Sequence, residues 1–479
     1  MSAGSSDTRL PINSTPASTP YFFDSMMRAI RTKRQETWYA IVGACAVLTI
    51  VVPAAFSKTW YIKPDGTGDA PTIQAGVDAA SPGDIVLVAA GTYATTSVVD
   101  VNGTPSAVCV AIGKDIRLLS ESGSLNTTIG NASANIAIYI HDVGSSAEIN
   151  GFRIQTAFEP YACVDGPSEM TLNGPLPPFL KRGISCRNGS PLITNNNITT
   201  NGAAVELLGS PATLTANTVT LAPRGIACLD GSDAVIANNV IHTCASAISC
   251  DASSPTVTGN DLYDGCTGIR SRLGSPIVTD NLIHDFSPYG IDCATSITLE
   301  NNHISDNAVG VFLGGVGITV VRGNIFNSHF YYAIEIWGPT EGAITIEGNT
   351  IDGSGSAIFC QAGANPLIRR NIIVRSFFGI RCALSSFPVM ECNDVVTFQA
   401  RYIGDCTDQT GLNGNISVDP QFCGLTDSGN YGLQGDSPCA PGNHPSGYSC
   451  GRIGARDVAC GAVATKSTTW GAIKAMYKE

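Results

Sequence analysis

The sequence predicts an all-β protein, a single-stranded right-handed parallel β-helix of about 10–13 turns with roughly 22 residues per turn. Two motifs and one composition pattern predict this fold. An apolar-x-x-Asn-x-apolar motif recurs in steps of 21 to 25 residues from Asn196 to Asn393. A Gly or Ala followed by Ile or Val recurs in the same phase from Gly183 to Gly379. Each period holds short apolar or alternating segments between Gly, Ser, Pro and Asn, which is typical of strands and turns.

The overall composition excludes several other classes of protein. The chain has 479 residues, of which 27 are basic and 39 acidic, so its net charge is −12. This balance argues against a nucleic-acid-binding protein, which would carry a basic surface. Only 14% of the residues are charged and 51 are Gly, which disfavours a coiled coil or a long helical array. An apolar content of 43% is too high for a wholly disordered chain.

The repeated Asn and Cys residues are expected to belong to the scaffold. Equivalent Asn side chains in stacked turns can form a ladder of amide hydrogen bonds, and Asn tolerates the left-handed conformation that a tight bend needs. Cys recurs three residues after the small residue of the second motif, at an inward position, where we expect a column of small buried hydrophobic side chains. A disulfide between neighbouring turns is the alternative. The positions are Cys186, Cys228, Cys250, Cys293, Cys360 and Cys382.

The chain is divided into five segments by composition and period. Residues 38–56 read as the hydrophobic region of a signal peptide, with an uncleaved membrane anchor as the alternative. Removing this region, which contains Cys45, leaves 16 of the 17 Cys, in keeping with export to an oxidising compartment. The five segments are a disordered, basic N-terminal segment (residues 1–37), the apolar segment (38–56), the parallel β-helix (59–395), a Cys-rich C-terminal cap (396–461) and a tail (462–479).

Both ends of the helix need caps, because raw ends would expose sheet edges and core. The apolar periodicity from Ile73 to Ala80 predicts one short helix, which with the next strand can cover the N-terminal end. At the other end, six Cys between Cys392 and Cys460 predict a cap held by disulfides, whose connectivity cannot be deduced from spacing.

The chain resembles the secreted bacterial right-handed parallel β-helix proteins of the pectin-lyase-like superfamily. The segment WYIKPDGTGDAPTIQAGVDAASPGDIVLVAAGTY resembles their entry module, and the two repeat motifs and the closing DPQF and SPC segments resemble the same group. The resemblance covers about residues 59–461. It implies the fold and a substrate-binding region along the sheet that begins with the Gly-Ile motif. Activity does not follow, because lyases, hydrolases, epimerases and adhesins share this fold.

On that sheet, the positions two residues after each small residue are predicted to point outward and to stack in one column. They are Ser185, Glu206, Ala227, Ser249, Arg270, Asp292, Phe312, Glu335, Phe359 and Arg381. Charged and aromatic groups therefore mix between Arg270 and Trp337. The long loop from Gln155 to Arg182 is expected to overhang the early turns of this face. We expect substrate binding by Glu206, Arg272, Phe312, Trp337 and Lys181.

The candidate catalytic residues are Arg270, Asp292 and Glu335. Asp292 and Glu335 lie two turns apart, roughly 10 Å between backbones, near the carboxylate separation of inverting glycosidases. The competing interpretation is that Asp292 forms an ion pair with Arg270 or Arg272 on a solvated sheet. A lyase of this fold would use calcium-bound Asp residues with an Arg or Lys base, so Ca²⁺ stays open as a cofactor. The residues themselves predict no metal site, and the six His share no recognisable column.

Two functions from different classes remain. The first is a secreted or cell-surface protein that binds extracellular polysaccharide along the Gly-Ile sheet without catalysis. The alternative is a polysaccharide-active enzyme, either a pectate-lyase-like lyase or an inverting glycoside hydrolase. The missing Asp-pair, Gly-His-Gly and Asp-Pro-His signatures favour the first. We expect a monomer with a glycan partner, no nucleic acid, and membrane contact only through residues 38–56 if these stay uncleaved.

Overall fold

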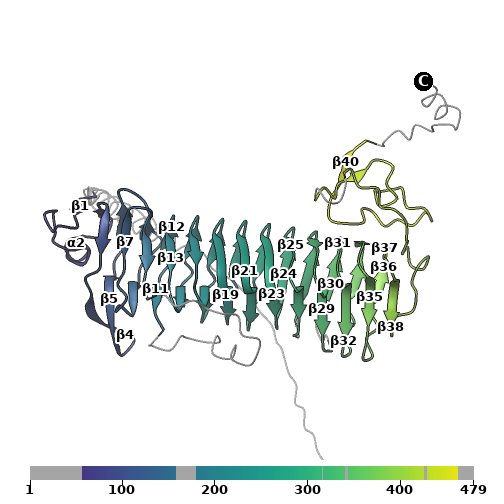
Figure 1. Cartoon of the computed structure of the whole chain (residues 1–479), viewed down its shortest axis with the longest axis horizontal. Coiled ribbons are helices and arrows are strands. Elements are labelled where there is room, and N and C mark those ends of the chain that lie inside the picture. Colours follow the sequence, from purple (N-terminus) through teal and green to yellow (C-terminus); the bar gives the residue numbers. More distant parts are fainter. Residues whose placement is uncertain (1–56, 158–179, 316, 340–343, 425–428, 462–479) are drawn as a thin grey trace, which may run out of the picture. The chain divides into compact units, whose positions relative to one another are not determined.

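The structure is a computed structural model, shown in Figure 1. It describes residues 57–157, 180–315, 317–339, 344–424 and 429–461. The predicted N-terminal segments 1–37 and 38–56, the tail 462–479 and most of the loop from Gln155 to Arg182 lie outside the described residues. Within the described ranges, no helix has both the length and the apolarity needed to span a bilayer.

The described chain forms a parallel β-solenoid, as predicted (Figure 1). Its first sheet has 14 strands, slightly more than the expected number of turns, because the first turns carry neither repeat motif. The strands of this sheet are β1 (Thr59–Ile62), β2 (Ile85–Val88), β6 (Arg117–Ser120), β9 (Glu148–Asn150), β12 (Leu192–Thr194), β15 (Thr213–Thr215), β18 (Val235–Ala237), β20 (Thr256–Thr258), β22 (Ile277–Thr279), β24 (Ile297–Glu300), β27 (Thr319–Arg322), β30 (Ile344–Glu347), β33 (Leu367–Arg369) and β36 (Val389–Glu391).

A second, 24-stranded sheet bends into two faces. The short-strand face follows the repeated Asn. It contains β3 (Gly91–Tyr93), β7 (Thr127–Ile129), β10 (Arg153–Gln155), β13 (Asn197–Thr199), β16 (Thr218–Thr220), β25 (His303–Ser305), β28 (Ile325–Asn327), β31 (Thr350–Asp352), β34 (Ile372–Val374) and β37 (Asp394–Val396). Three strands of 12 residues continue from this face onto the next, namely β19 (Val240–Asp251), β21 (Asp261–Arg272) and β23 (Leu282–Cys293).

We call the other face the Gly-Ile face, because nearly all its strands contain the second motif. Besides the later halves of β19, β21 and β23, it contains β5 (Thr104–Ile112), β8 (Ile136–His141), β11 (Arg182–Arg187), β14 (Ala203–Leu208), β17 (Arg224–Leu229), β26 (Val309–Leu313), β29 (Tyr332–Trp337), β32 (Ser356–Gln361), β35 (Phe378–Cys382) and β38 (Ala400–Gly404). The small residue of the motif is needed where the chain enters the strand. A Cβ built on Gly268 would lie 2.5 Å from the carbonyl oxygen of Gly290 in the next turn.

The repeated Asn residues form the predicted ladder, which continues to Asn415. Each side-chain Nδ2 from Asn196 to Asn393 donates to Oδ1 of the Asn in the next turn at 2.9–3.1 Å. These side chains are almost fully buried. The left-handed conformation occurs one residue earlier than expected: Asn195, Asn238 and Asn301, for example, have φ of 54–58°. The residue before the ladder therefore makes the bend, and the ladder Asn fixes it.

The predicted Cys column is also confirmed, except at its last position. Cys228 pairs in register with Cys250, and Cys360 with Cys382. The other thiols of the column, those of Cys186, Cys228, Cys250, Cys293 and Cys360, are buried and free. Cys382 instead forms a disulfide with Cys406, whose Cα lies 5.3 Å away. Cys406 lies in a later loop and not in a stacked turn of the column, so the stacking of the repeats could not predict this disulfide.

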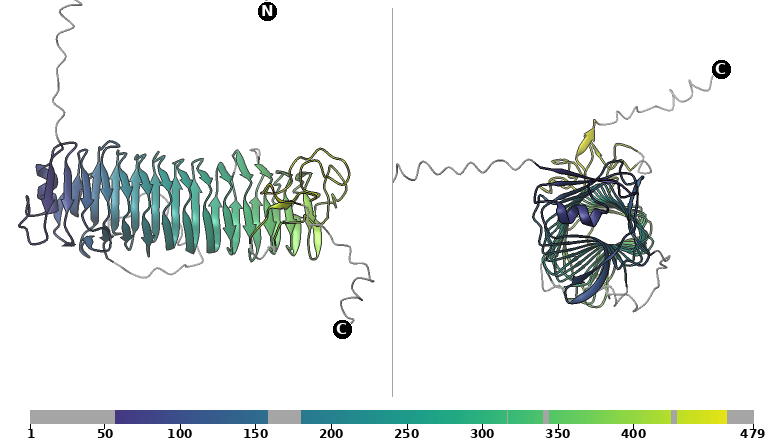
Figure 2. Two further views of the ribbon diagram at one scale, coloured as in Figure 1. Left: turned by 90° about the horizontal axis from the view of Figure 1, so that it is seen from above. Right: turned by 90° about the vertical axis from the view of Figure 1, so that its left-hand side faces the viewer.

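The N-terminal end is covered by α2 (Ile73–Ala79), close to the predicted helix (Figure 2, right). Thr72 begins this helix, because its hydroxyl accepts a hydrogen bond from the backbone N–H of Ala75 at 3.1 Å. Ile73 and Val77 point into the core. A hairpin that is absent from the repeat pattern follows: β4 (Ser97–Val101) pairs antiparallel with β5.

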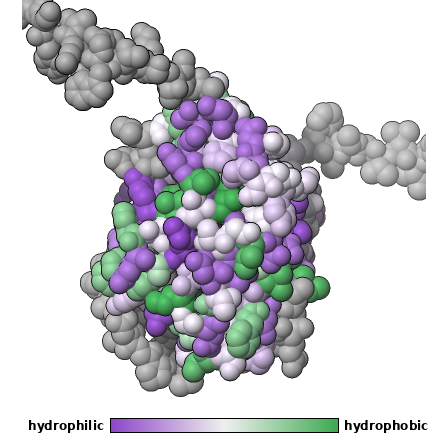
Figure 3. All heavy atoms as spheres, turned by 90° about the vertical axis from the view of Figure 1, so that its right-hand side faces the viewer, coloured by the Kyte–Doolittle hydropathy of each residue, from purple (hydrophilic) through white to green (hydrophobic). Residues whose placement is uncertain are grey.

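The C-terminal region is held by disulfides, as expected, although not by pairing all six Cys among themselves. Cys392 pairs with Cys450 and Cys423 with Cys460, while Cys439 is a buried free thiol. The region contains the short strands β39 (Leu433–Gln434) and β40 (Val458–Cys460). The end of the solenoid that carries it shows green and purple residues interspersed in Figure 3, without one large apolar patch.

A buried carboxyl group beneath the C-terminal region gives a prediction about pH. Asp394 is fully buried, accepts a hydrogen bond from the backbone N–H of Val418 at 3.0 Å, and lies 3.2 Å from Sγ of Cys439. Burial raises the pKa of Asp394 to about 6. Between about pH 4 and pH 6, Asp394 is therefore protonated in the folded state and ionised in the unfolded state. The protonated carboxyl contributes to the free energy of unfolding below about pH 4, and this contribution is lost as the pH rises to about 6 and above.

We expect Asp394→Asn to stabilise this region by up to about 3 kcal/mol at pH 7, because the neutral amide carries no charge to be buried. Hydrogen exchange of the C-terminal amides between pH 4 and pH 7 measures this effect. Asp436→Asn removes an exposed carboxylate from the same region and is the matched control. A variant whose pH dependence stays parallel to that of the wild type would exclude Asp394 as the titrating group.

Candidate functional site

The predicted outward column on the Gly-Ile face is confirmed turn by turn. Strand pairing places Ser185 opposite Glu206 and continues in register through Arg270, Asp292 and the later positions to Arg381. The backbones of neighbouring turns are therefore about 4.8 Å apart along this column. The candidate site residues therefore follow one another along the sheet in the same order as in the sequence.

One cluster on this face joins two of its arginines to a carboxylate. Asp292 Oδ2 lies 2.6 Å from an Nη of Arg272 and 3.8 Å from Nε of Arg270. Arg272 also donates to the backbone carbonyl of Ser271 at 2.9 Å. All three side chains are at least two-thirds buried. The predicted ion pair of Asp292 is thus present, although its side chains are buried rather than solvated. The arrangement suits recognition of hydroxyl or anionic groups by a fixed guanidinium.

A second cluster lies on the earlier turns, and of its residues only Ser185 and Glu206 were predicted to lie on this face. Nε of Arg182 donates to the fully buried Glu206 at 2.6 Å, and Ser185 Oγ lies 3.4 Å from the same oxygen. Arg224 is also fully buried, and desolvation lowers its pKa to about 10. The sequence does contain a pattern that could have identified these arginines. Arg182 and Arg224 each directly precede the Gly of the second motif, in the turns on either side of Glu206.

Aromatic side chains surround Glu335 in the later turns. In the register of the sheet, Glu335 lies between Phe312 and Phe359. Its Oε1 accepts a hydrogen bond from Gln361 at 2.7 Å, and burial raises the pKa of this carboxyl. Two aromatic pairs flank it, with ring centroids 5.4 Å apart for Tyr289–Phe312 and 5.0 Å for Tyr332–Phe359. The guanidinium of Arg381 lies 4.7 Å from the ring centre of Phe359.

The aromatic region continues beyond the sheet onto the adjoining corner. An open hollow of about 660 Å³ lies there, with Asp285, Asp306, Phe330 and Tyr331 among its lining residues. Phe330 is 75% exposed and Tyr331 is 54% exposed. Large aromatic surfaces in water beside carboxylates are typical of surfaces that bind amphipathic ligands such as sugars.

The remaining predicted site residues are placed as follows. Trp337 ends β29, next to Gln361 in register, and is 52% exposed. Lys181 precedes β11, four strands away from Arg270 on β21, and its Nζ lies 3.4 Å from the backbone carbonyl of Ser133. Lys181 is thus brought together neither with Arg270 nor with Asp292. The other candidates, apart from Glu206, lie within four consecutive strands of the Gly-Ile face, from β21 to β29.

The side chains that could hold a metal ion are dispersed or already engaged. Among the described residues, no three His, Cys, Asp or Glu side chains are arranged to hold a metal ion. Glu206 and Asp292 are each engaged by an arginine. The expectation that the histidines share no column is wrong: His242, Tyr263 and His284 stack on the short-strand face, with ring centroids 4.8 and 5.2 Å apart.

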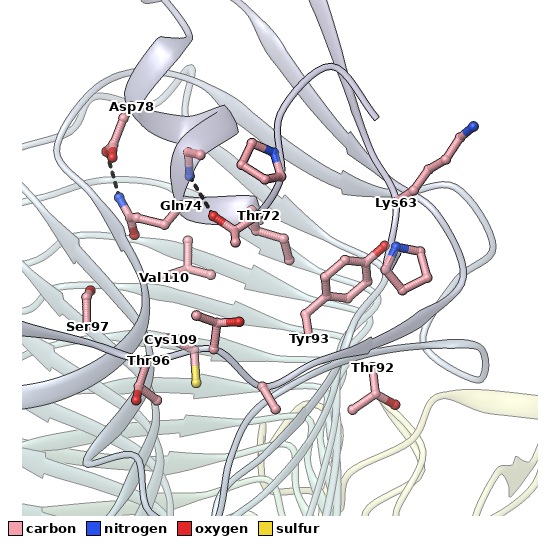
Figure 4. A pocket seen from close by; sticks show the side chains of 16 residues that line it. Lys63, Thr72, Gln74, Asp78, Thr92, Tyr93, Thr96, Ser97, Cys109 and Val110 are labelled. Atoms are coloured by element: carbon pink, nitrogen blue, oxygen red, sulfur yellow. Dashed lines mark hydrogen bonds between the residues drawn. The ribbon is translucent and has the colours of Figure 1, made fainter. Parts of the chain in front are cut away.

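A further pocket of about 330 Å³ lies under α2 at the N-terminal end (Figure 4). Its polar side chains Thr72, Gln74, Asp78 and Tyr93 hydrogen bond within the protein. Gln74 donates to Asp78 at 2.8 Å and accepts from the backbone N–H of Ala111 at 2.7 Å, while Thr72 accepts from Ala75. The Tyr93 hydroxyl donates to the carbonyl of Ala89 at 3.0 Å. This pocket therefore belongs to the capping structure, and the Gly-Ile face is the better candidate site.

Comparison with known proteins identifies the repeat. The family model described as "right handed beta helix region" matches residues 180–299 and 290–434, which together make up more than half of the chain. No curated protein matches the sequence.

Several solved structures have similar folds. The A-module of the mannuronan C-5 epimerase AlgE6 of Azotobacter vinelandii is 16% identical, with coverage of 66% of this chain and 94% of that one and a TM-score of 0.37. Pectate lyase Pel9A is 13% identical, with coverage of 84% and 97% and a TM-score of 0.42. The catalytic domain of a GH87 alpha-1,3-glucanase in complex with nigerose is 13% identical, with coverage of 67% and 64% and a TM-score of 0.32. The likeness concerns the fold alone.

Proposed function

Since this chain belongs to the family of right-handed β-helix proteins, we propose that it is an extracytoplasmic protein that binds polysaccharide along its Gly-Ile face, without catalysis. The observation that carries the proposal is the aromatic set Tyr289, Phe312, Tyr332 and Phe359 beside Glu335, on a sheet with one such position every turn. Aromatic rings stack on the apolar faces of sugars, and fixed polar groups bind their hydroxyls. A regular row of both suits a regular polymer.

Two further features support this proposal. The disulfides Cys382–Cys406, Cys392–Cys450 and Cys423–Cys460 suit an oxidising, extracytoplasmic compartment. In addition, Lys181 lies four strands away from Arg270 and contacts the carbonyl of Ser133, so it does not complete a lyase site with Arg270 and Asp292.

Replacing the aromatic side chains tests the proposal. We expect Phe312→Ala and Trp337→Ala each to weaken polysaccharide binding about three- to tenfold, because one ring–sugar contact is lost. Calorimetric titration of the full-length protein with pectate, alginate, chondroitin and neutral glycans, with and without calcium, gives the affinity. Tyr448→Ala removes a comparably exposed aromatic ring from the C-terminal region and serves as the control. Equal binding by all three variants and the wild type would place the site elsewhere.

The raised pKa of Glu335 favours a second candidate function, inverting glycoside hydrolysis. Glu335 would be the general acid and Asp292 the base that activates water, two strands away. Incubation of the protein with the same glycans distinguishes the two functions, when the formation of new reducing ends and of ultraviolet-absorbing products is measured. New reducing ends that disappear in Glu335→Gln would establish hydrolysis. Unsaturated products would establish a lyase and direct attention to Arg270. Binding with neither signal supports recognition alone.

A further inference from the structure

The N-terminal end of the Gly-Ile face is closed by the β4–β5 hairpin. Val99 and Val101 of β4 pack against Val108, Ile136 and Tyr139. Ile136 and Tyr139 occupy the same outward columns of the sheet as Arg182 and Ser185 in the next turn. The hairpin therefore covers the first turns of the face, and a ligand that lies along the sheet meets a wall there.

A pocket of about 330 Å³ lies where the uncovered face begins. Its lining includes Asn102 at the tip of the hairpin, Tyr139 and His141 on β8, Arg187 on β11 and Leu208 on β14. The turns beyond these strands add the remaining lining residues Asp142, Asn188, Gly209 and Asp230. Asp230 directly follows β17, so the pocket is formed jointly by the closing hairpin and by four successive turns of the solenoid.

The polar groups of the pocket leave one cationic donor without a partner. Nε of Arg187 is buried, and no hydrogen-bond acceptor reaches it in the described ranges of the chain. The nearby carboxylate of Asp142 is engaged by His141 Nδ1 at 3.1 Å and by Asn188 Nδ2 at 3.4 Å, and these bonds lower its pKa. The His141 ring stacks on Tyr139 with centroids 5.2 Å apart. A buried N–H of a guanidinium without an acceptor favours a ligand that supplies one, above all an anionic oxygen.

We propose that this pocket binds the terminal sugar of a polysaccharide chain, with an acidic group of that sugar, a carboxylate or a sulfate ester, on Arg187. The proposal rests on polysaccharide binding along the Gly-Ile face. The chain runs from the pocket over the Arg270–Asp292 cluster toward the aromatic rows, and the hairpin prevents it from extending the other way. The protein then recognises the ends of polysaccharide chains, so the amount of protein bound by a polysaccharide is proportional to its number of chain ends.

Oligosaccharides with modified ends test this proposal with the full-length protein. The probes are oligogalacturonates of one length, either intact, reduced to the alditol at the reducing end, or blocked by a bulky substituent at the non-reducing end. Sulfated and neutral oligosaccharides of similar length distinguish the two acidic groups and the need for charge. We expect one of the two end modifications to weaken binding about tenfold or more, and the neutral probe to bind weakly.

Variants of the pocket complete the test. Arg187→Gln should weaken binding of the intact acidic probe about tenfold, whereas Arg153→Gln, which removes an exposed charge from the short-strand face, should leave it unchanged. Leu208→Phe narrows the pocket without changing charge and should reproduce the loss, with far-ultraviolet circular dichroism confirming the fold. Binding that tolerates both end modifications and Arg187→Gln overturns the end pocket alone. A wild-type protein that binds no glycan overturns the proposed function and this site with it.

Discussion

Replacing Asn281 with Ala is expected to lower the free energy of unfolding of the β-helix by about 3–6 kcal/mol, because several buried hydrogen bonds are lost and one buried N–H is left without an acceptor. Oδ1 of Asn281 accepts from both the backbone N–H and Nδ2 of Asn260, each at 2.9 Å. Nδ2 of Asn281 donates to the carbonyl of Val257 at 2.9 Å and to Oδ1 of Asn302 at 3.0 Å. Alanine removes these bonds and leaves the buried backbone N–H of Asn260 without its acceptor, whereas Nδ2 of Asn260 keeps the carbonyl of Ile236 and Oδ1 of Asn302 keeps the backbone N–H of residue 281.

Hydrogen exchange of the ladder amides is the suitable measurement, since a solenoid opens turn by turn rather than in one step. Exchange should accelerate most in the turns of Asn260 and Asn302. Asn197→Ala is a matched control, because Asn197 is half-buried and points outward next to the ladder residue Asn196. Similar destabilisation by both variants would show that the buried amide network does not determine the stability of the corner.

A second large effect on stability is expected from removing the disulfide between Cys392 and Cys450, which are 58 residues apart in the sequence. A cross-link over this length stabilises the folded state by about 4 kcal/mol through the lost entropy of the unfolded chain. Replacing both residues with Ala should therefore destabilise the C-terminal region by about that amount. Exchange rates of amides around Ile416 and Leu433, which belong to the same apolar cluster as both Cys, report this change.

Comparison with reductant separates the effect of the cross-link from that of the lost side chains. The wild type should become less stable in dithiothreitol, and the Cys392→Ala/Cys450→Ala variant should respond much less. Cys439→Ala removes a buried thiol of the same region that forms no disulfide, and its response to reductant should match that of the wild type. A double variant as stable as the oxidised wild type would mean that packing alone holds this region.

The fold could be predicted from the sequence because stacking repeats one geometry. A period near 22 residues fixes which side chains lie above one another, so the positions of Asp292, Phe312 and Glu335 followed from counting alone. Elements that depart from the period could not be found in this way. The β4–β5 hairpin lies before the motifs begin, and the partner of Cys382 comes from a loop outside the repeat.

The candidate site was predictable only to a limited extent, for a related reason. Residues two positions after the small residue were found because simple alternation places them outward. Arg182 and Arg224 were missed because the chain bends at the Gly that follows them, so alternation assigns them to the wrong side. His242 and His284 lie in one column. Counting from the ladder would have revealed this, because each His follows the ladder Asn of its turn by three residues. Roles in binding remain proposals, since register determines where a side chain lies but not what it contacts in a ligand.

Whether polysaccharide lies along the Gly-Ile face is best determined by hydrogen–deuterium exchange of the full-length protein with and without its best-binding glycan. We expect protection of peptides from β21 through β32 and of the adjoining corner at Phe330 and Tyr331, with little change in the first sheet. Protection concentrated in the first sheet or the C-terminal region, with the Gly-Ile face unchanged, would show that the glycan binds elsewhere.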